Sequence, residues 1–263
     1  MGDQHGDFIW YELLTTDPDA AQRFYSAVVG WDFAPSGMPG GDYRFFSYAG
    51  QGIGGMLHIT PEDCAKGARA CWLGYIGVND VDASAASIQA AGGTVLIPPT
   101  DIPGVGRFAM VTDPQGHPFY LMRGSSPEAS HSFSTSGIGH CVWNELNAQE
   151  HKAMLTFYGE QFGWQSGDFI DMGPMGEYRF ITQNGVSIGA MMTVTPGTQD
   201  PQWTYYFMVA DIDVAAAAIV AEGGQVLQGP SEVPGTLFMV RGLDPLGTEF
   251  AIVGQRHGAG AAA

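Results

Sequence analysis

The chain has 263 residues and a formal net charge of −17, from 10 basic and 27 acidic side chains. That balance argues against a nucleic-acid or anionic-membrane surface, because both need a basic footprint. The 38 glycines and 16 prolines predict many turns and short elements, and no apolar run approaches the roughly 18 residues of a membrane-spanning helix.

Strands and helices are predicted to alternate through the first half. An apolar strand comes first, and Asp17-Pro18 then starts a helix that ends at Gly30. A second helix begins at Asp80 and ends at Gly92-Gly93. The strands are predicted over residues 8–14, 31–33, 43–48, 53–59, 72–78, 94–97, 108–112 and 119–122. The half therefore consists of two successive β-α-β-β-β modules.

The second half repeats the first. Trp10-Tyr11-Glu12-Leu13 returns as Trp143-Asn144-Glu145-Leu146, 133 residues later, and Asp113-Pro114 returns as Asp244-Pro245, 131 residues later. Small drifts in the offset are what loop insertions and deletions produce. We predict two tandem domains, at residues 1–124 and 137–254. A Ser-rich linker at residues 125–136 joins them, and a flexible tail at residues 255–263 follows.

The start of the chain and its cysteines both predict a cytoplasmic protein. Residues 2–7 lack the basic and apolar regions of a signal peptide. Cys64, Cys71 and Cys141 are odd in number and form no C-x-x-C pair, so we expect reduced thiols rather than a disulfide framework or a thiolate metal site.

The ordered motifs resemble the vicinal oxygen chelate superfamily, which includes glyoxalase I, bleomycin-resistance proteins and extradiol dioxygenases. They are Phe-Tyr before Gly-Trp, the helix start Val78-Asn79-Asp80-Val81-Asp82, the Gly-Gly turn and Asp-Pro-x-Gly before the last strand. Two-domain glyoxalase-like proteins of the mycobacterial 27 kDa antigen type also share Trp-x-Glu-Leu and Gly106-Arg107-Phe108. The resemblance implies an α+β fold in which paired βαβββ modules form a U-shaped, open sheet cavity in each domain.

The resemblance also locates the superfamily's metal ligands, which are His or Glu on set strands. The matching positions in this chain are Trp10, Leu73, Tyr120 and a neighbour of Met56, and then Trp143, Thr204, Ala251 and a neighbour of Met191. Indole, leucine and alanine cannot ligate a hard divalent cation. We therefore expect no metal and no other cofactor in either domain.

Glu12 and Glu145 are the candidate catalytic residues. Each lies two residues after a Trp on the first strand, so each shares that Trp's face of the sheet. An apolar setting favours the protonated form of a carboxylate, so either glutamate could act as a general base. The alternative is a structural ion pair with Arg44 and Arg179, which recur in step with the glutamates.

A larger set is predicted to contact a ligand. Its members are aromatic or adaptable side chains on strands, together with polar residues that differ between the halves. They are Trp10, Trp143, Tyr75, Tyr206, Met56, Met191, Arg107, Tyr120 and His58. Trp72 and Trp203 have the opposite strand parity and should pack beneath the helices. The differences predict that the first domain has the more polar site.

Two functions follow as alternatives. The first is a metal-independent protein that binds a small apolar or aromatic molecule. The second is a lyase or isomerase acting on a small carbonyl compound, with Glu12 or Glu145 as the base. A third role, in protein interaction, has no support beyond the resemblance. No nucleic-acid or membrane partner is expected, and the chain is expected to act as a monomeric pseudo-dimer or as a homodimer.

Overall fold

The computed structural model describes residues 2–38, 41–194 and 200–257. Its strands form two eight-stranded mixed sheets with the same connectivity, in the orders β2-β3-β4-β1-β5-β8-β7-β6 and β10-β11-β12-β9-β13-β16-β15-β14. The order matches strand for strand, so the duplication read from the sequence is a duplication of structure. The predicted α+β class is confirmed.

The first half follows the predicted order closely. Its elements are β1 (Phe8–Thr15), α1 (Pro18–Val28), β2 (Asp32–Pro35), β3 (Tyr43–Tyr48), β4 (Gln51–His58), α2 (Pro61–Ala65), β5 (Cys71–Gly77), α3 (Val81–Ala90), β6 (Thr94–Ile102), β7 (Gly106–Thr112) and β8 (Pro118–Gly124). Asp17 and Asp80 cap the two predicted helices by accepting hydrogen bonds from backbone amides. The short helix α2, which begins with a Thr60/Asp63 capping box, was not predicted.

The second half repeats the strands and the longer helices of the first, and it adds a 3₁₀ turn between β10 and β11. Its elements are β9 (Cys141–Ala148), α4 (His151–Phe162), β10 (Gln165–Asp171), η1 (Gly173–Met175), β11 (Glu177–Gln183), β12 (Val186–Thr193), β13 (Gln202–Val209), α5 (Ile212–Ala221), β14 (Gln225–Val233), β15 (Leu237–Leu243) and β16 (Glu249–Gly254). Helix α4 ends at Gly163, whose positive φ of 75° gives the left-handed cap that glycine accepts without strain.

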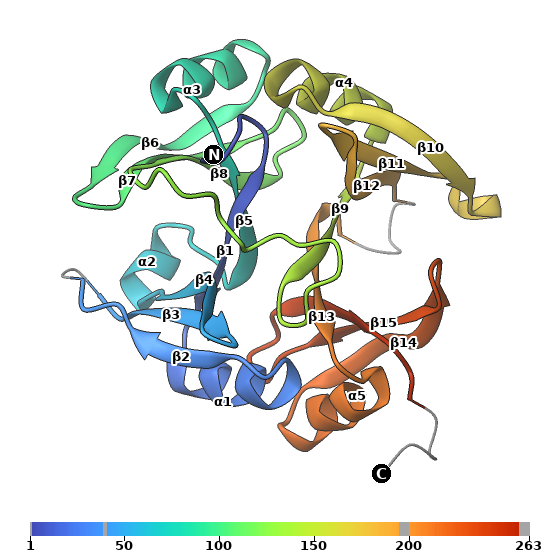
Figure 1. Cartoon of the computed structure of the whole chain (residues 1–263). Coiled ribbons are helices and arrows are strands. Elements are labelled where there is room, and N and C mark those ends of the chain that lie inside the picture. The colour runs from blue at the N-terminus through green and yellow to red at the C-terminus, as the bar shows by residue number, and fades with distance from the viewer. Residues whose placement is uncertain (1, 39–40, 195–199, 258–263) are drawn as a thin grey trace. The chain divides into compact units, whose positions relative to one another are not determined.

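The chain forms two compact units, and each unit combines one module from either half. Unit 1 comprises residues 1–10, 73–135 and 143–204, and unit 2 comprises residues 11–72, 136–142 and 205–263. Within unit 1, α3 lies beside α4, and within unit 2, α1 lies beside α5 (Figure 1). The compact units therefore differ from the tandem division read from the sequence.

Each module has a helix on one face of its strands. We call the face that carries α1, α3, α4 or α5 the helix face, and the opposite one the inner face. In unit 2, the helix face carries Tyr11, Trp31 and Trp72, and Trp72 donates to the Tyr25 hydroxyl of α1 at 3.1 Å. Trp203 donates to Tyr158 of α4 at 3.0 Å in unit 1. The predicted placement of Trp72 and Trp203 beneath the helices is confirmed.

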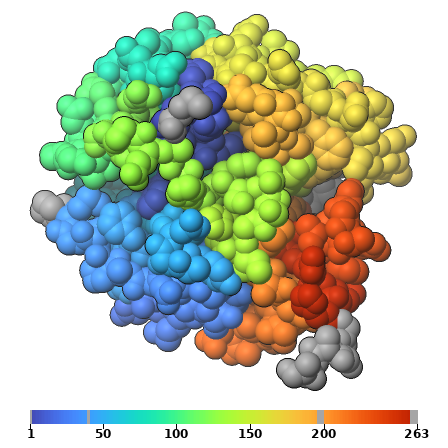
Figure 2. Space-filling view, in the orientation of Figure 1, coloured from blue at the N-terminus to red at the C-terminus, as the bar shows by residue number. Residues whose placement is uncertain are grey.

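The linker is tied to the start of the chain within unit 1. The backbone amide of Ser130 donates to Asp3, and its hydroxyl donates to the carbonyl of Ile9. Ser132 is completely buried. The N-terminal segment and the linker are both visible on the face shown in Figure 2, in dark blue and green. Of the predicted tail, residues 258–263 lie outside the described residues, whereas Arg256 pairs with Asp213 at 2.8 Å.

Candidate functional site

The inner face of unit 1 holds Glu145 in a hydrogen-bonded cluster on β9. The Tyr178 hydroxyl donates to Glu145 Oε2 at 2.8 Å, and Asn147 Nδ2 donates to Glu145 Oε1 at 2.9 Å. The Trp143 indole N–H in turn donates to the Tyr178 oxygen at 2.7 Å. Since both carboxylate oxygens receive donors, the arrangement suits the ionised, acceptor-only form of Glu145. We call Trp143, Glu145, Asn147 and Tyr178 the Glu145 cluster.

Strand register places this cluster on the inner face. Glu145 is opposite Ala190 on β12, and Ala190 is opposite Phe180 on β11. Side chains alternate along a strand, so Trp143 and Tyr178 lie on the same face as Glu145. The Trp143 ring meets the Phe180 ring edge-on at 5.7 Å. Trp143 is half-buried, in contrast to the buried Glu145 and Asn147.

Glu12 occupies the corresponding position in unit 2, on β1, and is 3 % exposed. It is opposite Gly55 of β4, and Gly55 is in turn opposite Phe45 of β3. The Tyr43 ring lies over Gly55, where any Cβ would overlap it. Partial burial and the negative charge of Glu12 together raise the pKa of the Cys71 thiol to about 12. A carboxylate thus lies close to an uncharged thiol on the inner face.

The raised pKa of the Cys71 thiol predicts that it is alkylated slowly. At pH 8, a pKa of about 12 leaves so little thiolate that iodoacetamide should modify Cys71 on the order of 1000-fold more slowly in the folded than in the unfolded protein. Glu12→Gln removes the negative charge, lowers the pKa of the thiol and should accelerate the reaction. Time-resolved peptide mass spectrometry measures the rate at each cysteine.

Glu62→Gln is the matched control, because Glu62 is exposed and pairs with Lys66 on α2. It should leave the Cys71 rate unchanged. Equal rates for Cys71 in wild-type protein and in Glu12→Gln would contradict the assigned charge of Glu12.

Two further predicted aromatic residues meet on the inner face of the β5–β8 module, in the first of the two sheets. Tyr75 of β5 is opposite Tyr120 of β8, and their rings stack at 4.2 Å with an interplanar angle of 21°. In unit 2, Tyr206 of β13 is opposite Ala251 of β16. The three tyrosines and Ala251 are all buried. Trp10, the remaining aromatic candidate, is half-buried.

The predicted ion pair between these glutamates and Arg44 or Arg179 is wrong. Arg44 pairs with Asp19 and Asp42, each at 2.7 Å, and Arg179 pairs with Glu177 at 2.8 Å. The physical reason is strand alternation. Each arginine directly follows Tyr43 or Tyr178, so it points to the helix face while the tyrosine points to the inner face.

Register places three residues of the predicted ligand set on the helix face. Met56 is opposite Leu13, and Met191 is opposite Leu146 and Arg179, so both methionines lie on the helix face. His58 is opposite Thr15, two residues beyond Met56 on the same face. The inner-face positions of β4 and β12 are instead taken by Gly55, Leu57, Ala190 and Met192.

Arg107 likewise lies on the helix face rather than on the inner face. It shares the helix face with Ala109 and pairs with Asp82 of α3 at 2.6 Å and with Asp101 at 2.9 Å. Arg107 and His58, on which the prediction of a more polar site in the first half relied, therefore do not contribute to the inner face. The inner face of the second half carries Asn147 and Thr204, where the first half has Leu14 and Leu73.

The second half holds a charged pair that the sequence reasoning missed. Arg241 of β15 pairs with Glu249 of β16. Arg241 is opposite Ala251, which places the pair on the inner face of unit 2. The counterparts in the first half are Met110 and Pro118. A position-by-position comparison of the two halves would have singled out this pair, and also Asn147 and Thr204.

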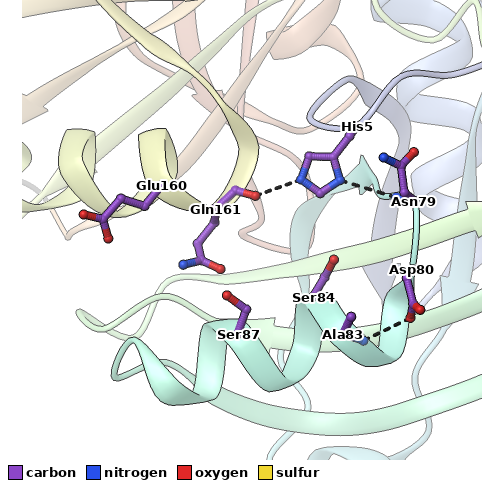
Figure 3. A pocket seen from close by; sticks show the side chains of 8 residues that line it. All are labelled: His5, Asn79, Asp80, Ala83, Ser84, Ser87, Glu160 and Gln161. Atoms are coloured by element: carbon purple, nitrogen blue, oxygen red, sulfur yellow. Dashed lines mark hydrogen bonds between the residues drawn. The ribbon is translucent and has the colours of Figure 1, made fainter.

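A separate hollow lies between α3 and α4 in unit 1, with a volume of about 370 Å³ (Figure 3). His5 connects its two sides. Its Nε2 donates to the carbonyl of Gln161 at 2.8 Å, and its Nδ1 accepts from the backbone amide of Asn79 at 3.4 Å. Both ring nitrogens are thereby used, and the lining contains none of the predicted site residues.

Comparison with known proteins assigns the family. The model of the Glyoxalase/Bleomycin resistance protein/Dioxygenase superfamily matches residues 8–121 and again residues 137–252. The chain belongs to this superfamily. The two matches place one superfamily domain in each half, which confirms the resemblance and the tandem domains.

Relatives of this superfamily member span nearly its whole length. "Putative glyoxylase CFP32" of Mycobacterium tuberculosis is 30% identical over 247 residues, covering 93% of both chains. "Anthracycline biosynthesis protein DnrV" of Streptomyces peucetius is 30% identical, covering 97% of this chain and 95% of DnrV.

Solved structures of the superfamily share the fold. The Mn(II)-bound glyoxalase from Novosphingobium aromaticivorans has a TM-score of 0.65 at 18% identity and covers 96% of this chain and 83% of its own. A homoprotocatechuate 2,3-dioxygenase from Brevibacterium fuscum has a TM-score of 0.66 at 17% identity, covering 98% and 84%.

The residues of this chain do not fit the metal that such structures hold. The described residues contain no group of three His, Cys, Asp or Glu side chains that could hold an ion. Trp143 uses its only polar atom on Tyr178, and Tyr120 stacks on Tyr75. The inner-face positions on β4 are Gly55 and Leu57. Nor does any described helix combine the length and the hydropathy needed to cross a bilayer.

Proposed function

We propose that this protein binds a small, planar aromatic molecule on its inner faces without the help of a metal ion. The observation that carries the proposal is the state of Trp143. Its indole is fixed by the hydrogen bond to Tyr178 and by edge contact with Phe180, and the residue is not fully buried. A fixed ring can stack on a flat ligand at little entropic cost.

The donor chemistry supports the metal-independent part of the proposal. Indole, leucine, tyrosine, threonine and alanine side chains occupy the positions at which the superfamily places its ligands, so a divalent cation would find no carboxylate or imidazole there. The Streptomyces relatives are named as anthracycline biosynthesis proteins. Anthracyclines are fused-ring, planar molecules, and this supports an aromatic ligand.

Hydrogen bonds hold the Glu145 carboxylate in one orientation. Both oxygens of Glu145 accept hydrogen bonds from neighbouring side chains, at 2.8 and 2.9 Å. The carboxylate is therefore held in place as an acceptor, which suits the orientation of a ligand.

Calorimetric titration with 2-methylanthraquinone tests the proposal. We expect binding that is unchanged by EDTA, and Trp143→Ala should weaken it by about tenfold, or about 1.4 kcal/mol, because the stacking surface is lost. Phe169→Ala is the matched control, since Phe169 is an exposed ring that stacks under Arg179 away from the inner face. No binding in wild-type protein, or loss of binding in EDTA, would refute the proposal.

A further inference from the structure

Polar groups on the inner face distinguish the second half of the chain from the first. Asn147 and Thr204 replace Leu14 and Leu73, whereas the glutamate and the tyrosine of the cluster occur in both halves. Asn147, Thr204, Glu145 and Tyr178 all belong to unit 1. The second half has therefore gained hydrogen-bonding capacity at positions where the first half is aliphatic.

Thr204 has a buried hydroxyl group whose hydrogen-bonding capacity is not used within the described part of the chain. It is 4 % exposed, and its Oγ1 has no hydrogen-bond partner among the described residues. Leaving a buried hydroxyl unpaired is unfavourable, so such an atom calls for an explanation. Alternation from Trp203, which lies on the helix face, turns Thr204 to the inner face.

Thr204 and the Glu145 cluster lie on neighbouring strands. In the sheet order, β13 is adjacent to β9, and adjacent strands are about 4.8 Å apart. The two strands thus present complementary groups on one face. Glu145 accepts hydrogen bonds only, whereas the Thr204 hydroxyl can donate one.

We infer that the second half recognises a neutral hydroxyl group on the aromatic ligand, which donates to Glu145 and accepts from Thr204. The inference rests on the proposed function, and it specifies a polar substituent of the ligand that the proposed function does not name. A hydroxyl satisfies both partners with a single oxygen. A carboxylate or phosphate on the ligand would instead face the negative charge of Glu145 and is excluded.

Three matched anthraquinones test the inference by calorimetry. Relative to 2-methylanthraquinone, 2-(hydroxymethyl)anthraquinone should bind about tenfold more tightly, because it supplies the missing hydrogen bonds. Anthraquinone-2-carboxylate should bind more weakly than both. Equal affinity of the methyl and hydroxymethyl compounds would overturn the inference while leaving the proposed function intact. Failure of all three to bind would refute the proposed function itself.

Thr204→Val separates recognition from folding. Valine has the shape of threonine without the hydroxyl, so the unliganded variant should melt at the wild-type temperature or above it. The preference for the hydroxymethyl compound should fall from about tenfold to about twofold. Asn147→Leu, which restores the first-half residue, should also reduce the preference by freeing the Glu145 carboxylate to move.

Thr156→Val is the control for the loss of a threonine hydroxyl. Thr156 is exposed on α4, where its hydroxyl donates to the carbonyl of Lys152. This variant should retain the full preference. A Thr204→Val protein that keeps the wild-type preference would overturn the assigned role of Thr204.

Discussion

Asp113→Ala is expected to destabilise the protein by about 3–5 kcal/mol, because it removes the centre of a buried polar network. Asp113 is 1 % exposed. One oxygen accepts from the backbone amides of Gln115 and His117 at 2.9 and 3.0 Å. The other accepts from Tyr158 at 3.1 Å and contacts His117 Nδ1 at 2.6 Å. Alanine removes the acceptor that all of these donors share.

The network explains why the effect should be large. Trp203 donates to Tyr158, and Tyr158 donates to Asp113, so the chain of hydrogen bonds joins β13, α4 and the turn before β8 within unit 1. Gln115 in the same turn also binds Gln149 and Glu150 at the start of α4. Losing Asp113 loosens several elements at once.

Urea denaturation followed by circular dichroism measures the loss. Asp80→Ala is the control, because Asp80 is an exposed helix cap that accepts a single backbone hydrogen bond. It should cost about 1 kcal/mol. If the two variants unfold at similar urea concentrations, the buried network does not contribute as assigned.

Local signals were enough to predict the order of the strands and of the longer helices. Asp17-Pro18 and Asp80 mark the starts of helices. Each carboxylate accepts hydrogen bonds from backbone amides within the next three residues, so the capping interaction depends on local sequence alone. The repeated motifs then fixed the number of modules. The family followed from the order in which those motifs occur.

The faces of the strands could be predicted only where alternation was counted along one strand. Trp72 and Trp203 were placed correctly because each was compared with residues of its own strand. Arg44 and Met56 were misplaced because their relation to Glu12 depends on the register between β1, β3 and β4. Register arises from contacts between distant segments, and a shift of one residue inverts every side chain.

Repetition of a residue pair was also misleading. Glu12 and Arg44 recur together as Glu145 and Arg179, which suggested direct contact between them. The arginines recur because their own partners recur, as Asp42 in one half and Glu177 in the other. The differences between halves were the better guide to the site, since Asn147 and Thr204 have no polar counterpart.

Gly189→Ala is expected to cost about 3 kcal/mol or more, because the new methyl group would overlap backbone rather than side chain. Gly189 of β12 is opposite Asn144 of β9, and a Cβ there would collide with the carbonyl of Asn144. A backbone atom in a paired strand cannot turn aside. The substitution must therefore separate β12 from β9. Strand β9 also carries Glu145, so the separation should disturb the Glu145 cluster.

Urea denaturation and the 2-methylanthraquinone titration together give the readout, and both stability and binding should fall. Gly124→Ala provides the matched control at the end of β8, where a Cβ meets no atom within 4 Å. Its stability should stay within about 0.5 kcal/mol of wild type. A Gly189→Ala protein as stable as Gly124→Ala would mean that β12 and β9 approach each other less closely than described. The inner-face placement of Glu145 depends on that pairing, so the same result would also remove the basis for the binding site.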